Sequence, residues 1–385
     1  MTNRIKNNSW VIVFSVASVL FGWHAGGGFA TGNQANVFFV STGWWAPFSA
    51  VLAVLLLTLT VRQAMIMYNQ RGLTNYKQLF SALYHPFDWL GIVFEIYFYI
   101  MVLMATSASI AGAGMLFQEV AHISYFVAVC IIGLLLLALT MFGADLVRRA
   151  SLVMSVLILV CALSIFLVGI VAKSGEVTAI AAAGPETAKL PNAFLQAFQY
   201  AGFQCASIPT MVACGAALAS QKQAKRSMWI SFAMNAAALC LSVVMLLGWK
   251  SVYGAIDGGS VIPTLTVCKQ LGMPLLIWAY DICLFLCFLS TGTASIFGLT
   301  ERFCNTKAFQ GLKSAYAKRA AVAFIVMAIS MTVSFAGLTN IVKYGYGYCG
   351  YAGIVLLVIP FLTVGAYKNK KYRENHPEIS EKFPA

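Results

Sequence analysis

Two carboxylates lie inside long apolar runs of the sequence. Glu95 and Asp281 are 186 positions apart, each is followed by isoleucine, and each precedes a similar run of small residues, Ser107–Ile110 or Thr293–Ile296. A carboxylate inside a membrane segment is costly and is therefore a functional candidate, as a proton carrier or as an attractant for a cation. The alternative is a protonated or hydrogen-bonded acid that packs the structure.

Two other apolar runs contain residues that interrupt a helix. Gly26, Gly27 and Gly28 stand in the middle of the first run, and Pro209 stands in the sixth. Each glycine costs about 1 kcal/mol relative to alanine in a helix, and proline lacks the N–H that a helical bond requires. The pattern predicts two broken helices whose free N–H and C=O groups can bind an ion or a small solute. Close helix packing through small residues is the alternative.

Polar and aromatic side chains accompany both interruptions. His24 stands beside the glycines, where it either titrates near neutral pH or bonds freed backbone carbonyls. Tyr200, Phe203 and Gln204 stand on neighbouring turns before Pro209, as a ligand pocket requires.

The composition places these residues in a membrane. Of 385 residues, 60% are hydrophobic and 10% are charged, whereas soluble domains average about 45–50% and about 25%. This excludes a soluble enzyme and a disordered chain. Ten apolar segments can be drawn, and we expect each to span the bilayer: 9–40, 44–67, 88–117, 123–142, 146–171, 193–219, 227–248, 273–299, 318–338 and 340–366.

The basic residues predict the orientation. There are 25 Lys and Arg against 12 Asp and Glu, a net charge of +13. If the N-terminus is cytoplasmic, 20 of the 25 basic residues fall in cytoplasmic loops or tails, as the positive-inside rule demands. The charge therefore indicates topology in a cell membrane with both termini cytoplasmic, and it does not indicate a nucleic-acid partner.

The sequence offers no resident cofactor or metal centre. The ten cysteines form no CxxC pair and no His/Cys ligand spacing. The motifs HExxH, GxSxG and GxxxxGK[ST] are absent, so we expect neither an enzyme nor an ATP-driven transporter. A membrane-embedded enzyme of another type and a channel remain the competing classes.

The paired acids and paired breaks indicate an internal repeat. Segments three and eight carry the acids, and segments one and six carry the breaks, so five segments per half are equivalent and the second half is inverted. The predicted units are a first repeat over 1–171, an extracellular loop over 172–192, a second repeat over 193–366 and a cytoplasmic tail over 367–385.

Short motifs resemble the YkvI-like permeases, a branch of the amino acid–polyamine–organocation superfamily with the LeuT-type fold. The stretch Gly26–Gly32 followed by Gln34 resembles their GAGFATGQ signature, and three further stretches are similar: Ala111–Gly114, Ile262–Leu265 and Gly298–Arg302. That family usually has an acid after the GQ pair. Here Asn33, Gln34 and Ala35 carry none, so no coupling role is transferred to such an acid.

The resemblance implies a ten-helix, all-α secondary transporter with broken helices 1 and 6. Its solute would be an amino acid or related amine, moved by alternating access without an obligate protein partner. The implied solute site lies at the two breaks, and we expect it to comprise His24, Gly26, Gly27, Gly28, Tyr99, Tyr200, Ala201, Gly202, Phe203 and Gln204.

The resemblance also implies a cation site between helices 1 and 8. Na⁺ would be held by the carbonyls of Gly22 and Ala25 and by hydroxyls of Ser290, Thr291 and Thr293. Each hydroxyl can instead bond its own i−4 carbonyl. Proton coupling through Asp281 or His24 is the rival, and we expect Asp281 to matter more than Glu95 because it shares a helix with these hydroxyls.

Overall fold

The computed structural model describes residues 9–24, 26–256, 261–303, 309, 311, 314–377 and 383. The first half contains α2 (Ser9–His24), α3 (Gly27–Ala30), α4 (Asn33–Phe38), η1 (Val40–Trp45), α5 (Ala46–Gln70), α6 (Tyr76–Tyr84), α7 (Leu90–Ala121), α8 (Tyr125–Ala138), η2 (Leu139–Gly143), α9 (Ala144–Ala172), α10 (Ser174–Ala183) and η3 (Thr187–Lys189). The second half contains α11 (Leu190–Gln204), η4 (Cys205–Ser207), α12 (Ile208–Gly215), α13 (Gln221–Gly254), α14 (Pro263–Gln270), α15 (Pro274–Phe303), α16 (Ala315–Ser334), α17 (Leu338–Asn340), η6 (Ile341–Tyr346), α18 (Gly347–Gly353), η7 (Ile354–Val358), η8 (Phe361–Gly365) and α19 (Ala366–Asn375).

The predicted membrane segments are helical. Within the described residues, six helices are long and apolar enough to cross a membrane unaided. The pair Leu159–Ala172 and Ser174–Ala183, bent by 74°, makes a seventh if the two helices count as one span. The other predicted segments are built from shorter helices: α2 to α4, α8 with η2, and α11 with α12. Several helices begin at side-chain caps, and Asn75, Ser124 and Ser220 each accept a backbone N–H three residues later.

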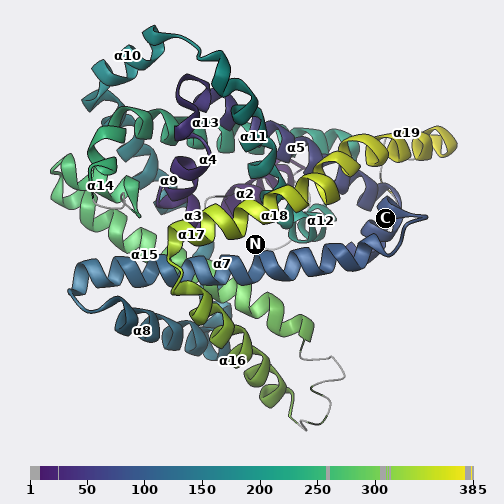
Figure 1. Ribbon diagram of the computed structural model, residues 1–385. Coiled ribbons are helices and arrows are strands. Elements are labelled where there is room, and N and C mark those ends of the chain that lie inside the picture. Colours follow the sequence, from purple (N-terminus) through teal and green to yellow (C-terminus); the bar gives the residue numbers. More distant parts are fainter. Residues whose placement is uncertain are drawn as a thin grey trace.

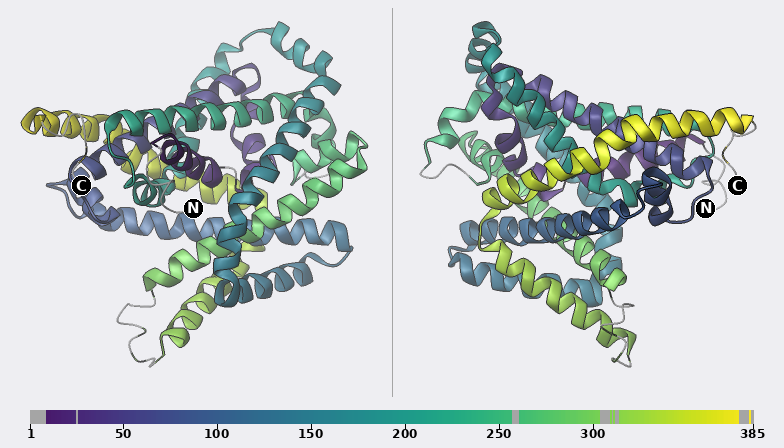
Figure 2. Two further views of the ribbon diagram at one scale, coloured as in Figure 1. Left: turned by 180° about the vertical axis from the view of Figure 1, so that it is seen from behind. Right: turned by 45° about the vertical axis from the view of Figure 1, so that its right-hand side comes forward.

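The two long helices α7 and α15 run antiparallel through the molecule. Arg302 at the end of α15 pairs with Glu95 near the start of α7, so their opposite ends meet. In Figure 1, α8 and α16 lie below α7, most of the other helices lie above it, and α15 crosses it. Both further views show α8 and α16 projecting from the bundle in the same way (Figure 2).

The helices α14 and α19 lie at opposite ends of the bundle and give these ends their names. The α14 end carries α14, and the α19 end carries α19, at opposite sides of Figure 1. The charge bias predicts that the α19 end is cytoplasmic, and this orientation stays a prediction.

The last helical segment continues well beyond residue 366, where a polar tail is predicted. It is helical through Asn375 because its polar side chains are held by the bundle. Lys368 Nζ donates to the carbonyls of Ala82, Leu83 and His85 at 2.9–3.0 Å, and Asn369 accepts from Gln70 Nε2 at 2.8 Å.

Candidate functional site

The first membrane segment is interrupted twice. α2 ends at His24, the four-residue α3 begins at Gly27, and Gly32 adopts φ 77° before α4. The carbonyl of Gly26 accepts bonds from the N–H groups of Phe29 and Ala30 at 3.0 and 3.1 Å. The predicted break is confirmed, and it extends over the glycine-rich stretch.

The sixth membrane segment changes from α11 through the 3₁₀ turn η4 to α12, where Pro209 occupies the first turn. The phenol of Tyr97 donates to the carbonyl of Gly202 at 2.8 Å. In the described part of the chain, Ser207 Oγ is buried without a hydrogen-bond partner. The break therefore places polar groups in the protein interior, and one of them, the Ser207 hydroxyl, has no hydrogen-bond partner among the described residues.

The two breaks meet at a buried polar group that we call the His24–Tyr200 cluster: His24, Gln34, Tyr200 and Gln204. His24 Nε2 lies 2.7 Å from Tyr200 Oη. The same phenol donates to Gln34 Oε1 at 3.3 Å and accepts from Gln204 Nε2 at 3.4 Å. All four side chains are 5% exposed or less, so these bonds form where little water competes.

Aromatic rings surround the cluster. The ring centroids of Phe38, Phe39 and Phe203 lie 4.9–5.6 Å from that of Tyr200, and Phe29 lies 5.0 Å from His24. Several polar atoms with apolar walls are the usual lining of a small-molecule site.

Most of the predicted solute-site side chains come together, and one does not. His24, Tyr200, Phe203 and Gln204 lie at the cluster. Tyr99 lies elsewhere, with its hydroxyl on Glu95 and its ring 4.8 Å from that of Phe303. Tyr99 shares a helical face with Glu95, and its hydroxyl is bound there.

Gln34 is a cluster member that the predicted set omits. It stands in the short α4, two residues after the positive-φ Gly32, and this turn directs it back to Tyr200. The available signal was its place in the glycine-rich signature.

The glycines of the predicted site are closely packed in this structure. A Cβ at Gly27 would collide with the ring of Phe288, and one at Gly28 would collide with the amide of Gln34. A Cβ at Gly202 would collide with the carbonyl of Gly350 on α18. Protein atoms thus occupy the space that was expected to admit a solute, while Ala201 beside Gly202 is fully buried.

Of the proposed cation ligands, Thr291 lies at the first break, beside a backbone carbonyl that was not predicted. Thr291 Oγ1 and the carbonyl oxygen of Trp23 lie 3.4 and 3.5 Å from the Cβ position of Gly26, so both approach one point at the first break. Thr293 Oγ1 is buried and has no hydrogen-bond partner among the described residues. Gly22 lies in the last turns of α2 and Ser290 on α15. Ala25 lies outside the described residues.

The two intramembrane acids have different surroundings. Glu95 Oε2 lies 3.4 Å from Arg302 Nη1 and accepts from Tyr99 Oη at 2.6 Å. The guanidinium also lies 4.1 Å from the ring centroid of Phe98 and 4.4 Å from that of Tyr76. Glu95 is therefore an ion-paired acid at the α19 end of α7 and not an isolated charge.

Asp281 lies toward the α14 end of α15. It interacts electrostatically with Lys269 and Glu119, which form an ion pair with each other. Its Oδ1 is buried without a hydrogen-bond partner in the part of the chain that the structure describes. Asp281 thus keeps an unsatisfied carboxylate oxygen beside an ion pair that joins α14 to α7.

α14 covers the first break from its own end of the bundle. The backbone N–H of Thr264 donates to the carbonyl of Thr31 at 3.1 Å, and Asn33 Nδ2 donates to the carbonyl of Val261 at 2.9 Å. A Cβ at Gly32 would collide with Thr264 Oγ1. These contacts close the α14 end over the His24–Tyr200 cluster.

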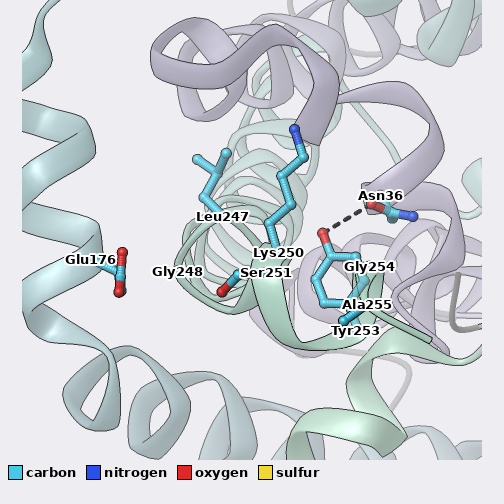
Figure 3. Close-up of a pocket in the computed structure, with 9 residues that line it drawn as sticks. All are labelled: Asn36, Glu176, Leu247, Gly248, Lys250, Ser251, Tyr253, Gly254 and Ala255. Carbon is cyan, nitrogen blue, oxygen red and sulfur yellow. Dashed lines mark hydrogen bonds between the residues drawn. The ribbon is translucent and has the colours of Figure 1, made fainter.

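A separate cavity of about 760 Å³ lies at the α14 end, outside this closure. Glu176 on α10 faces the last turns of α13, and Tyr253 donates to Asn36 Oδ1 at 3.0 Å (Figure 3). Its lining is Asn36, Glu176, Leu247, Gly248, Lys250, Ser251, Tyr253, Gly254 and Ala255. None of these residues belongs to the predicted site.

Comparison with known proteins shows the fold. The structure is similar to MhsT in complex with L-phenylalanine, at 12% identity over 91% of this chain and 97% of that one, with a TM-score of 0.58. It is similar to a Na⁺-coupled sialic acid symporter, at 13% identity over 98% of both chains and a TM-score of 0.55. A manganese transporter of Eremococcus coleocola gives 16% identity over 93% and 86%, with a TM-score of 0.54. The predicted LeuT-type fold is therefore confirmed.

The sequence itself has one short similarity. Over 126 residues it is 29% identical to the uncharacterized membrane protein YkvI of Bacillus subtilis (strain 168). The match spans 32% of this chain and only 36% of that relative. No family model matches the sequence.

Proposed function

We propose that this protein is a secondary active transporter of a small organic solute and not an enzyme. The observation that carries the proposal is the meeting of two broken helices at a buried polar cluster with aromatic walls. Broken helices at membrane depth occur where backbone lines a binding site. Two of the solved proteins with the same fold are, by their own descriptions, a manganese transporter and a Na⁺-coupled sialic acid symporter.

The proposed solute is an amino acid or related amine, and the proposed family is that of the YkvI-like permeases. The polar ends of the solute would contact the backbone at Gly26 to Gly28 and the polar atoms of the His24–Tyr200 cluster. The body of the solute would lie against Phe203. Because Phe288 fills the space beside Gly27, binding requires this ring to move. That requirement fits alternating access, in which the first, second, sixth and seventh membrane segments rock against the third, fourth, eighth and ninth.

The proposed coupling ion is Na⁺, held at the first break by oxygen atoms of helices 1 and 8. The approach of Thr291 Oγ1 and the Trp23 carbonyl to one point supports this assignment, because hard cations prefer oxygen ligands. Proton coupling is the second candidate, and His24 and Asp281, each with one unpartnered atom among the described residues, are the groups that would carry the proton.

A thermal-stability screen of the purified protein tests solute class and ion together. Amino acids and amines are added with Na⁺ or with choline. A ligand that binds only the folded state at 100 times its Kd adds about 2.7 kcal/mol of stability. We expect at least one amino acid or amine to raise the melting temperature, and more so with Na⁺. If no such compound does, the solute class is wrong, and if choline serves as well as Na⁺, the sodium assignment is wrong.

We expect Asp281→Asn to reduce uptake of the solute found in that screen while the yield of folded protein stays near wild type. The unpartnered Asp281 oxygen makes few stabilising contacts to lose. Glu95→Gln should instead lower the melting temperature, because it leaves the partly buried Arg302 guanidinium without its counter-charge. Uptake by reconstituted vesicles and melting temperature are measured for both variants. Normal uptake by Asp281→Asn would assign that acid to packing.

A further inference from the structure

One face of α13 carries a line of buried polar side chains. Ser227, Ser231 and Asn235 follow one another at four-residue spacing, which places them on one side of the helix. All three are fully buried. Ser242 lies on the same face two turns further and is also buried. From Ser227 to Asn235 the line covers about 12 Å of helix at 1.5 Å per residue.

Asn235 joins this line to the His24–Tyr200 cluster. Its Nδ2 donates to the carbonyl and hydroxyl oxygens of Ser231 at 2.8 and 3.0 Å. Its carboxamide also lies beside the imidazole of His24. Neither Asn235 Oδ1 nor His24 Nδ1 makes a hydrogen bond of normal geometry with any described residue. Each of these two buried side chains therefore keeps one polar atom that no described residue satisfies with a hydrogen bond of normal geometry.

The other end of the line approaches the α19 end through polar residues. Ser227 Oγ is buried without a partner in the described chain. Six residues earlier, Gln221 accepts from Arg373 Nη1 of α19 at 2.9 Å, and its own Nε2 is unpartnered. Arg62 on α5 lies near Arg373, and its Nε is likewise buried and unpartnered.

Close helix packing explains the small size of these residues but not their unsatisfied atoms. An unpaired buried donor or acceptor costs about 1–3 kcal/mol, and alanine would pack as closely without that penalty. Buried polar atoms of this kind are normally satisfied by ordered water. Ser227, Asn235 and Ser242 each have an unpartnered atom on one helix face, and Ser231 between the first two presents a hydroxyl to the same face, so the water that satisfies these atoms would follow that face.

We propose that water fills the α13 face from the α19 end to His24 and lets this imidazole exchange protons with that side of the membrane. A proton on Nδ1 would be donated to Asn235 Oδ1, and deprotonation would return it to this water. His24 could then change its protonation while α14 keeps the other end closed. The consequence for coupling rests on the proposed transport function, but the water path itself does not.

The described groups that contact His24 carry no fixed charge. Tyr200 on α11 is the titratable side chain in contact with the imidazole. The other contacts come from Phe29 on α3 and Asn235 on α13, which do not titrate. Within the described residues, no charged side chain acts on His24, and the nearest basic groups of the path are Arg62 and Arg373 at its mouth.

Cysteine accessibility tests the path without any knowledge of the solute. Ser227→Cys, Ser231→Cys and Asn235→Cys are treated with 2-aminoethyl methanethiosulfonate from each side of vesicles, and peptide mass spectrometry reads each site separately from the native thiols. Ala236→Cys and Val243→Cys are the matched controls, because both positions are buried and the 3.6-residue repeat places them on a different side of α13 from Ser227, Ser231 and Asn235. Only a thiolate reacts, and a thiolate requires water, so path positions should react at least about 10-fold faster than the controls.

A second measurement follows His24 itself. Diethyl pyrocarbonate applied from the α19 end should modify His24, and Ser231→Val should slow that modification about 10-fold by displacing water, while the volume-conserving Met228→Leu should not. Equal cysteine reactivity at path and control positions, or His24 modification that Ser231→Val leaves unchanged, would overturn the path. Labelling by a protein that transports nothing would reject the proposed function and keep the path.

Discussion

Gly202→Ala is expected to lower the melting temperature strongly, although a glycine-to-alanine change inside a helix ordinarily stabilises by about 1 kcal/mol. The added Cβ would collide with the carbonyl oxygen of Gly350 and lie 3.0 Å from the backbone nitrogen of Ile354. Both are backbone atoms, so no side-chain rotation relieves the collision. α11 and α18 must separate instead.

The opposing helix makes the same contact in reverse. A Cβ at Gly353 would collide with the carbonyl oxygen of Gly202, and one at Gly350 would collide with that of Gln199. Gln199 Nε2 also donates to the carbonyl of Gly347 at 2.9 Å. Glycines at three-residue spacing on α18 thus admit the backbone of α11, as small residues do between membrane helices. Overpacking here should exceed the usual penalty of about 1–3 kcal/mol.

Gly298→Ala is the matched control for Gly202→Ala. Gly298 lies in the helix α15, and nothing stands within 4 Å of its Cβ position. The two substitutions are chemically identical and differ only in the surroundings of the added methyl group. The melting temperature should therefore fall for Gly202→Ala and rise for Gly298→Ala. A Gly202→Ala protein as stable as the Gly298→Ala protein would show that α11 and α18 are not in backbone contact.

Local sequence signals predicted the helix breaks and much of the cluster. Three consecutive glycines and Pro209 act on their own backbone, so their effect does not depend on distant residues. His24 and Tyr200 then meet because they flank these two breaks. The helical spacing of Glu95 and Tyr99 likewise predicts a shared face, and the two side chains are hydrogen-bonded.

Contacts between distant segments were not predictable in the same way. The repeat treats Glu95 and Asp281 as equivalent, yet Glu95 has Arg302 as its partner and Asp281 retains a bare oxygen. The inverted arrangement places them at opposite ends of the antiparallel α7 and α15, so each meets different neighbours. Nothing in the local pattern around residue 95 indicates a cation 207 positions away.

The helical continuation to Asn375 has a similar cause. The composition of this segment is that of a solvated tail. Lys368, however, donates hydrogen bonds to the carbonyls of Ala82, Leu83 and His85 at the end of α6. Lysine near the end of a helix can cap such carbonyls. Which helix end it reaches depends on the fold and not on the local sequence.

Gly27→Val is expected to abolish saturable uptake of the solute identified by the stability screen. The sequence alone suggests that a side chain at Gly27 would fill the space of the solute. In the structure this position faces Phe288, and a Cβ would collide with the ring. A Cβ at Gly112 on α7 would collide with the tip of the same ring, so Phe288 packs against two glycines. A larger residue at Gly27 therefore prevents the ring from occupying its position beside the first break.

A double-mutant cycle separates this mechanism from general misfolding. Phe288→Leu removes the ring atoms that the valine would strike, so it should recover part of the melting temperature that Gly27→Val loses, because contacting residues are coupled by about 0.5–3 kcal/mol. Uptake should also recover only if the collision between the valine and the Phe288 ring is the sole cause of the loss. If the double variant is stable but still inactive, the solute needs the free space at Gly27 itself, as the broken-helix site requires. Normal uptake by Gly27→Val alone would show that the first break is not the solute site, whatever the melting temperature.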